Sequence, residues 1–305
     1  MEYEVFGLRV RSELPLDELF EAAPDSGDAD VDVRIGSIPR DDGEDGKSGY
    51  SLVGTAALLA VRDVGRYWID GGREIVVEPA PGTSERNLRL FLLGSAFGAL
   101  LHQRGLLPLH ANAIEFEGRA VAFMGHSGAG KSTLAAWFLD RGHRVLADDV
   151  CVVTFDGEGR PIAHGGIPRL RLWREAIEAS GRTAADYEHA FDAMDKYNVP
   201  TPRRSDREPL PLSHIYLLRR APDGAAAPAI ERLLGVEAVD ALVANTYRGG
   251  FLKSMGGTGR HLSQCVSLVA RAPVFRAERL WGYHAFEEQA AMIEDHVRTV
   301  IAGQG

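Results

Sequence analysis

Apolar and polar residues alternate along most of the first 80 positions of the chain. Short β-branched or aromatic runs, separated by Gly, Pro and Asp, occupy residues 3–12, 28–38, 50–64 and 66–80. A period of two places every second side chain on one face of a strand, and the intervening residues favour turns. The pattern predicts a β-rich N-terminal region over residues 1–82. The polar, glycine-rich segment 39–49 is expected to be a loop in that region.

The pattern becomes helical after residue 82, where a second domain, residues 83–305, is expected to begin. Residues 83–85 (Thr-Ser-Glu) offer capping side chains for an apolar helix that ends near Gly105. Apolar runs over residues 110–116 and 119–124 flank Glu117-Gly118, a pair that suits a hairpin turn. A glycine-rich turn, a helix to about residue 141 and one strand over residues 144–155 should follow.

The remaining third of the chain alternates between the two periodicities. Residues 173–194 have the spacing of a charged helix, and the proline-rich stretch 195–212 is expected to be a loop. Further strands are predicted over residues 213–220 and 229–235, and further helices over 235–247, 258–272 and 284–303. In the last of these helices, Ile293, Val297 and Val300 share one face. The predicted fold class is therefore mixed α/β (α+β).

Composition excludes several classes of protein. The 305 residues are 45% hydrophobic and carry a net charge of −9, which disfavours nucleic acid and anionic membranes as partners. The most apolar stretch, residues 88–101, is too short to span a bilayer, and the N-terminus lacks the features of a signal peptide. With only two cysteines, a zinc site or a disulfide framework has little support. We expect a cytoplasmic protein, and homo-oligomerisation stays open.

The segment after the predicted hairpin satisfies the pattern G-x-x-x-x-G-K-[ST]. Its glycines let successive backbone N–H groups converge on phosphate oxygens, and the following helix directs its positive end at the same anion. Lys131 can bridge β- and γ-phosphates, and the Ser132 hydroxyl can ligate Mg²⁺. The expected nucleotide-binding residues are Gly125, His126, Ser127, Gly128, Ala129, Gly130, Lys131, Ser132 and Thr133.

Two adjacent acids, Asp148 and Asp149, lie on the predicted strand that follows this helix. Neighbours on a strand point to opposite faces, so one acid would face the phosphates, unless a local twist brings both toward the site. One could then hold Mg²⁺ while the other accepts a proton from an attacking hydroxyl. His110 lies on the strand paired with the one that leads into the loop, and by itself it could be a purely structural histidine.

Residues 108–155 resemble the HPr serine kinase/phosphorylase family. The resemblance rests on a histidine-bearing strand (His110), a hairpin, the loop G-x-S-G-x-G-K-S (125–132) and "RGHRVLADD" (141–149). It implies a P-loop core of the type that HPr kinases share with phosphoenolpyruvate carboxykinases. It also implies catalytic residues: Lys131 on the phosphates of ATP, Asp148 as general base, Asp149 with Ser132 on Mg²⁺, and His110 supporting the acidic pair.

The resemblance also has departures that bear on the acceptor. The family's second signature and its glutamate ahead of a Gly-Leu-Gly stretch have no counterpart, and "AHGGIPRLRLW" (163–173) stands in that place. The stretches "FGLRVRSELPLDEL", "LPLHANAI", "PRLRLW" and "LSQCVSLVARAPVFR" resemble instead a divergent branch associated with lasso-peptide and related gene clusters. Members of that branch with an assigned activity phosphorylate a peptide serine.

The leading hypothesis is therefore an ATP-dependent kinase that phosphorylates a serine of a peptide or small protein. A kinase for a small hydroxylated metabolite would need the same core, with Lys196, Arg203, Arg204 and Arg207 available to grip an anionic substrate. A nucleotide-binding sensor or peptide chaperone without turnover is the third reading, although binding alone needs no spare carboxylate. The resemblance also permits phosphorolysis of phosphoserine.

Overall fold

The computed structural model describes residues 1–23, 27–39, 48–191, 195–201, 208–222, 227–280, 282 and 285–304.

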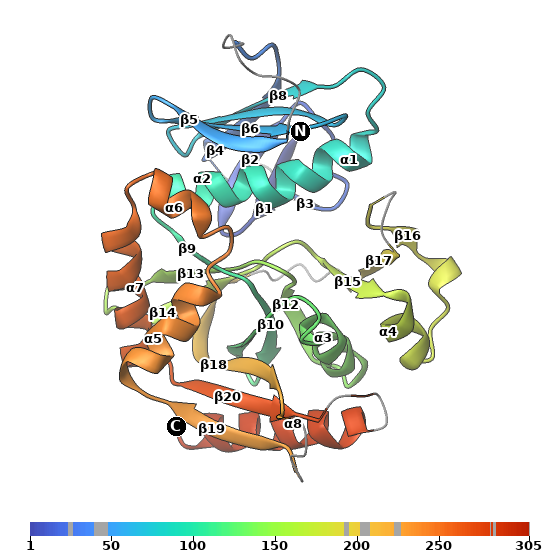
Figure 1. Cartoon of the computed structure of the whole chain (residues 1–305), viewed down its shortest axis with the longest axis vertical. Helices are drawn as coiled ribbons and strands as arrows, with labels where there is room; N and C mark the ends of the chain where they lie inside the picture. The colour runs from blue at the N-terminus through green and yellow to red at the C-terminus, as the bar shows by residue number, and fades with distance from the viewer. Residues whose placement is uncertain are drawn as a thin grey trace.

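The N-terminal region forms an eight-stranded sheet, as its alternating pattern predicts (Figure 1). The strand order is β3-β1-β2-β4-β8-β7-β6-β5. Residues 40–47, most of the predicted loop, lie outside the described residues. The strands are β1 (Glu2–Val5), β2 (Leu8–Ser12), β3 (Phe20–Glu21), β4 (Val31–Ile35), β5 (Gly49–Val53), β6 (Ala56–Val61), β7 (Gly65–Asp70) and β8 (Glu74–Pro79).

The helix predicted from residue 83 to about 105 is confirmed, with one π-helical turn inside it. It comprises α1 (Glu85–Phe91), the π turn η1 (Leu92–Ala96) and α2 (Phe97–Gln103), and the Ser84 hydroxyl accepts a hydrogen bond from the Asn87 N–H at 3.3 Å. Its apolar side packs on the N-terminal sheet in one continuous core that also takes in Val150, Val152 and Tyr247. The helix therefore lies between the sheet and the rest of the chain (Figure 1). The boundary at residue 82 stays a prediction.

A second sheet carries the candidate site. Its main path runs β12-β10-β11-β18-β14-β13-β9, with β20 paired to β18 and β19 paired to β20. Strand β18 is parallel to both β11 and β20, so the carboxyl ends of these three strands lie at one edge of the sheet. The strands are β9 (Leu107–Leu109), β10 (Ala111–Phe116), β11 (Arg119–Met124), β12 (Arg144–Ala147), β13 (Cys151–Phe155), β14 (Pro161–His164), β18 (Leu210–Arg220), β19 (Ala229–Leu233) and β20 (Val274–Arg279).

The predicted hairpin and the helix after the glycine loop are both confirmed. Strands β10 and β11 pair from Ala111↔Met124 to Phe116↔Arg119, and the turn residues Glu117 and Gly118 have φ angles of 49° and 73°. Positive φ at both central residues is the geometry that matches the twist of a two-residue hairpin. Helix α3 (Lys131–Asp140) starts where the loop ends.

The strand predicted over residues 144–155 is instead two strands. β12 ends at Ala147 and pairs with β10, whereas β13 starts at Cys151 and pairs with β9 and β14. Asp149, in the break, has a left-handed φ of 69°, and the Val150 N–H donates to the Asp148 carbonyl at 2.9 Å. The prediction of one continuous strand was wrong because the two halves find different pairing partners.

The charged helix predicted over residues 173–194 was wrong in length. Among the described residues 173–191, the α-helix is limited to α4 (Arg174–Ala179). Gly181 follows it with a φ of 74°, a conformation that ends helices. A 3₁₀ turn, η2 (Ala184–Asp186), and strand β16 (Glu188–His189) take the place of the later turns. β16 joins β15 (Arg169–Trp173) and β17 (Lys196–Pro200) in a small sheet of order β15-β17-β16, so part of the predicted loop is a strand.

The later helices agree with the prediction. They are α5 (Gly235–Ala244), α7 (Thr258–Arg271) and α8 (Phe286–Ala302), with a short additional helix α6 (Gly250–Ser254). In α8, Ile293 and Val297 are fully buried and Val300 is partly buried, as their spacing implies. Within the described part of the chain, no helix has both the length and the apolar character needed to cross a membrane.

The hairpin turn gives a test of the fold that leaves the site's side chains unchanged. A Cβ on Gly118 would meet nothing within 4 Å, so a substitution there acts through the backbone alone. We expect Gly118→Val to lower the free energy of unfolding by about 1–2 kcal/mol, the cost of a left-handed residue. Gly118→Asn should cost less, because Asn tolerates this conformation. If urea unfolding showed that both variants lose the same free energy of unfolding, the assigned turn would be contradicted.

Candidate active site

The glycine loop, residues 125–130, joins β11 to α3 at the carboxyl edge of the second sheet. Gly125, Gly128 and Gly130 all have positive φ angles, of 149°, 84° and 79°. A Cβ on Gly125 would lie 2.8 Å from the Leu218 carbonyl oxygen of β18, so the loop can approach the neighbouring strand only with glycine there. The first turn of α3 then directs unpaired N–H groups toward the space above the loop.

Lys131, the first residue of α3, is buried with its ammonium group held under the loop. Its Nζ donates to the carbonyl oxygens of Gly125 at 2.7 Å and His126 at 3.2 Å, and lies 3.2 Å from Nε2 of His110. Burial lowers the pKa of Lys131, while the nearby charges of Asp149 and Asp148 act in the opposite direction. The loop carbonyls therefore hold the cation at one end of the site, beside His110.

Asp148 is buried and fully hydrogen-bonded. Its Oδ1 accepts from the Asn112 side chain at 2.6 Å and from the Ser132 hydroxyl at 3.0 Å, and its Oδ2 accepts from the Arg171 backbone N–H at 2.8 Å. Burial, and then the neighbouring charge of Asp149, raise the pKa of the Asp148 carboxyl above the usual aspartate value. Asp148 thus links β10, α3 and β15 around one carboxylate.

Asp149, the next residue in the strand break, borders the cavity. Its Oδ1 is 3.1 Å from Nδ1 of His110, and its Oδ2 is 3.7 Å from the Arg171 guanidinium. Burial acts to raise the pKa of Asp149, but the hydrogen bond from His110 and the charges of Arg171 and Lys131 outweigh it and hold that pKa well below its usual range. The two acids thus do not point to opposite faces of a sheet, as they would on a regular strand. The break between the strands turns both toward the glycine loop, which is the second of the two arrangements expected from the sequence.

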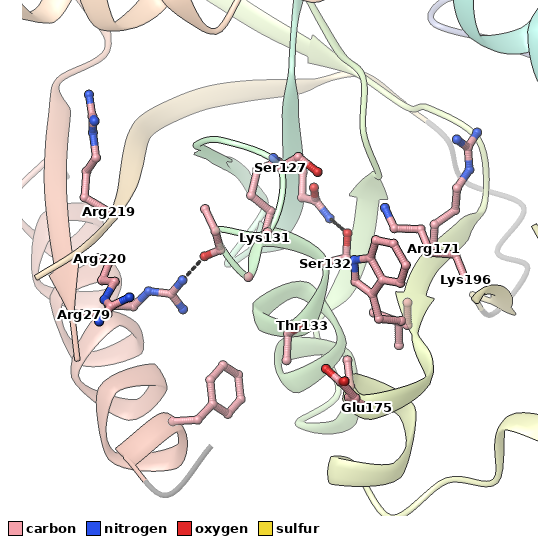
Figure 2. A pocket seen from close by; sticks show the side chains of 18 of the residues that line it. Ser127, Lys131, Ser132, Thr133, Arg171, Glu175, Lys196, Arg219, Arg220 and Arg279 are labelled. Carbon is pink, nitrogen blue, oxygen red and sulfur yellow. Dashed lines mark hydrogen bonds between the residues drawn. The ribbon is translucent and has the colours of Figure 1, made fainter. Parts of the chain in front are cut away.

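His110, Lys131 and Asp149 border a cavity of about 420 Å³. Figure 2 shows Arg219, Arg220 and Arg279 on one side of the loop and Arg171 and Lys196 on the other. The predicted site residues that line the cavity are His110, Ser127, Gly128, Ala129, Gly130, Lys131, Ser132, Thr133 and Asp149. Asp148 lies behind Ser132, and the Gly125 and His126 carbonyls face Lys131.

Several residues of this cavity were missed by sequence reasoning. Arg171 reaches the site because β15 lies beside the strand break, and the alternation Arg-Leu-Arg-Leu of residues 169–172 is the signal that could have placed it on a strand. Asn112 is a fully buried polar residue in the apolar strand β10, and its side-chain Nδ2 donates to Asp148 Oδ1. Of the cations proposed to grip a substrate, Lys196 lines the cavity, whereas Arg203, Arg204 and Arg207 lie outside the described residues.

The oxygen atoms around Ser132 fit a magnesium ion. Over the described residues, no group of three or more His, Cys, Asp or Glu side chains could hold a metal. Mg²⁺, however, is usually bound by one or two protein oxygens together with substrate phosphates and water. Ser132 Oγ and Asp148 Oδ1 lie 3.0 Å apart, and the buried Oδ1 of Asn112 has no partner within the described parts of the chain.

A glycine loop between strand and helix, followed by a lysine and two acids, is the layout typical of proteins that bind phosphate groups at a helix N-terminus. Within this class, the proteins that match part of this chain in sequence are HPr kinase/phosphorylases. An HPr kinase/phosphorylase from Chloroherpeton thalassium is 35% identical over 82 residues, which is 27% of this chain and 23% of that relative. One from Chlorobium phaeobacteroides is 41% identical over 82 residues, with the same two coverages, 27% and 23%.

These matches confirm the resemblance to the HPr kinase/phosphorylase family over a segment of the chain. A third relative of that name, from Prosthecochloris aestuarii, is 41% identical over 56 residues, which is 18% of this chain and 16% of the relative. The matched segments thus span less than a quarter of the relatives' length. No family model matches the chain. The HPr(Ser) kinase/phosphatase structure from Coxiella burnetii aligns with 63% of this chain and 97% of its own, at 11% identity and a TM-score of 0.33.

The burial of Asp148 gives a prediction about stability and pH. A carboxyl whose pKa is raised on folding contributes stability that is present below its unfolded pKa and is lost as the pH rises through its folded pKa. The stability of the wild type relative to Asp148→Asn should therefore fall as the pH rises from about 4, the ordinary carboxyl range. Urea unfolding of both proteins across this pH range measures the difference. If the stability of the wild type relative to Asp148→Asn rose with pH instead, the pKa of Asp148 would not be raised by folding.

Proposed function

We propose that the protein is an ATP-dependent kinase that transfers the γ-phosphate to a serine hydroxyl of a peptide or small protein. The observation that carries the proposal is the meeting of Lys131, Ser132 and the two acids at the end of one glycine loop, beside a cavity large enough for a ligand. The relatives are named HPr kinase/phosphorylase, which agrees with phosphoryl transfer by this core.

The loop and the start of α3 would hold the triphosphate. The backbone N–H groups of Lys131, Ser132 and Thr133 precede the first hydrogen bond of α3, from Leu134 to Gly130, and suit α- and β-phosphate oxygens. The Lys131 ammonium can turn from the loop carbonyls to the β- and γ-phosphates. Ser132, with Asp148 behind it, would hold Mg²⁺, whose charge when bound offsets that of the β- and γ-phosphates. Positioning and charge neutralisation would supply most of the catalysis.

The contacts favour Asp149, rather than Asp148, as the proton acceptor. Asp148 is the base implied by the family resemblance, and its raised pKa would suit that role. Both of its oxygens are already engaged inside the protein, however, whereas Asp149 faces the cavity. A base must first be within reach of its proton, and the pKa is the second consideration. We therefore propose that Asp149 takes the proton and that Asp148, through Ser132, supports the metal.

In the proposed reaction, the serine oxygen forms a bond to the γ-phosphorus while the bond from that phosphorus to the β–γ bridging oxygen breaks. The hydroxyl proton passes to the Asp149 carboxylate, and ADP leaves with the electron pair of the broken bond. His110 would orient Asp149, because its Nδ1 lies 3.1 Å from Oδ1 and 3.0 Å from the carbonyl oxygen of that residue. Its Nε2 accepts from Lys131, which leaves the Nδ1 proton for Asp149.

The proposed acceptor is a peptide serine, and the proposed location of the reaction is the cytoplasm. A peptide serine follows from the resemblance to kinases of lasso-peptide-type clusters, and the net charge of −9 disfavours nucleic acid and anionic membranes as partners. A cytoplasmic location fits an ATP-dependent reaction. The same core, run in the opposite direction, would remove phosphate from a phosphoserine.

A kinase for a small anionic metabolite is the second candidate, and one observation favours it. Arg171, whose guanidinium lies 3.7 Å from Asp149 Oδ2, and Lys196 both line the cavity, where a carboxylate or phosphate of a small acceptor could bind. Incubation with γ-³²P-ATP separates the two candidates. Label on a serine peptide encoded by a neighbouring gene supports the first, and ATP consumption with only small hydroxy acids supports the second.

Removing the lysine tests nucleotide binding. We expect Lys131→Ala to weaken binding of Mg–ATP about tenfold to a hundredfold, because a charge-assisted contact to phosphate is lost. Isothermal titration calorimetry measures the effect, and Lys253→Ala, an exposed lysine on α6, is the matched control. Unchanged affinity in Lys131→Ala would contradict the proposed phosphate site.

The two acids should separate in their effects. Asp149→Asn should leave Mg–ATP affinity within about threefold while phosphate transfer falls about 10²- to 10⁴-fold, the usual contribution of a general base. Asp148→Asn should weaken the binding of ATP mainly when Mg²⁺ is present. Calorimetry with and without Mg²⁺, together with γ-³²P transfer, measures both variants. If Asp148→Asn instead abolished phosphate transfer, and Asp149→Asn weakened the Mg²⁺-dependent binding of ATP, Asp148 would be the base.

A further inference from the structure

The cavity has an aromatic side chain on each of its two sides. Among the described residues that line it, Trp173 comes from the end of β15 and Phe286 from the start of α8. Neither is accounted for by phosphate or metal binding. Because every nucleobase has a flat π-face, an aromatic ring at the right end of a triphosphate site can hold the base by stacking. Which of the two rings can do so depends on the direction in which the triphosphate lies on the loop.

The polar contacts give the triphosphate a direction. Lys131, at the β- and γ-phosphate position, points to His110, and Ser132 points to Asp148, so the γ-end lies with the acids. The far side of the loop is occupied by Arg279, whose guanidinium donates to the Ala129 carbonyl and would lie 3.0 Å from a Cβ on Gly130. Figure 2 shows Arg279 and Arg171 on opposite sides of the loop. The nucleoside should therefore leave the loop on the Arg279 side.

Phe286 belongs to the Arg279 side. Gln289, which is only 3% exposed, accepts from the Leu280 N–H at 2.6 Å and donates to the carbonyl oxygens of Leu280 at 3.2 Å and Ala285 at 2.8 Å. These bonds tie the first turn of α8 to the residue that follows Arg279. The Trp137 indole N–H donates to Glu287 at 2.8 Å, which ties the same turn to α3. The backbone that carries Phe286 is thus held in place, and the Phe286 side chain packs, partly buried, against the core between α3 and α8.

Trp173 belongs to the acid side. It lies two residues after Arg171 on β15, and the Lys196 ammonium sits 4.9 Å from the centre of its ring. One face of the indole is therefore already covered by a cation that also lines the cavity. A base stacked there would require the triphosphate to run with its γ-end away from Asp149 and His110.

We propose that Phe286, with Leu280 and Arg279 beside it, forms the nucleoside subsite, and that the base stacks on the Phe286 ring. The proposal rests on the proposed function, because it assumes a nucleoside triphosphate on the loop. Leu280, Gly282 and Phe286 supply a largely apolar wall, and Gln289, whose amide is engaged with the backbone, holds its shape. The base would therefore be held mainly by the Phe286 ring, with Arg279 at the end of the subsite next to the loop.

Comparison of a full nucleotide with its phosphate chain alone tests the subsite. Calorimetry would measure Mg²⁺ complexes of a non-hydrolysable ATP analogue with a β–γ imido bridge and of inorganic tripolyphosphate. Phe286→Leu should weaken the analogue about tenfold, a typical stacking contribution, and leave tripolyphosphate within about twofold. Phe286→Tyr, which keeps the ring, should bind the analogue like the wild type. Trp173→Leu, the matched change on the opposite wall, should leave both ligands unchanged.

The possible outcomes separate this inference from the proposed function. Loss of both ligands in Phe286→Leu, or selective loss of the analogue in Trp173→Leu, would overturn the subsite. Equal affinity of the wild type for the two ligands would also overturn it, while the phosphate site would stand. If the wild type bound neither ligand, the proposed function itself would fail.

Hydrogen exchange on the unaltered protein covers the case in which Phe286→Leu does not fold. The ATP analogue, but not tripolyphosphate, should slow exchange in residues 285–290. Protection by both ligands in residues 125–133 is the internal sign that the loop is occupied. Selective protection by the analogue in residues 172–176 instead would place the base on the Trp173 side and overturn the proposal.

Discussion

The carboxylate of Asp148 is the contact on which the site depends. It draws together the side chain of Asn112 on β10, the hydroxyl of Ser132 on α3 and the backbone of Arg171 on β15. An ionised carboxylate is costly to bury, and only such a set of donors makes its burial tolerable. Without it, the helix that follows the glycine loop and the strand that carries Arg171 would have no shared polar anchor.

The break between β12 and β13, which pair with different strands, decides where the two acids lie. A continuous strand would send Asp148 and Asp149 to opposite faces of the sheet. The left-handed φ of Asp149, 69°, is one that Asp adopts at less cost than most residues. It turns Asp149 toward His110, while Asp148 stays beside Ser132. The two acids then differ in environment, since one has a raised pKa and the other a lowered pKa. Such divergence between neighbouring acids is typical of sites where they have different roles.

The parts of the site that could be predicted are those encoded locally. The strand, glycine loop and helix of residues 119–140 are contiguous in sequence, so their order and the glycines of the turn could be predicted from the pattern alone. Arg171 and Phe286 were not predicted, because they reach the cavity through the pairing of β15 and the packing of α8 on α3. The predicted helix over residues 173–194 failed for a related reason. Its later part pairs with β17, and tertiary contacts of that kind override helical spacing.

The central claim is that the loop and the buried Asp148 gather a triphosphate and a metal ion next to Asp149. A crystal structure with Mg²⁺ and the imido analogue of ATP tests it most directly. We predict a metal ion about 2.1 Å from Ser132 Oγ, the usual Mg–oxygen distance, with the β- and γ-phosphates at Lys131 and the terminal phosphate facing Asp149. A triphosphate bound away from residues 125–132, or a γ-phosphate directed toward Arg279, would contradict the account.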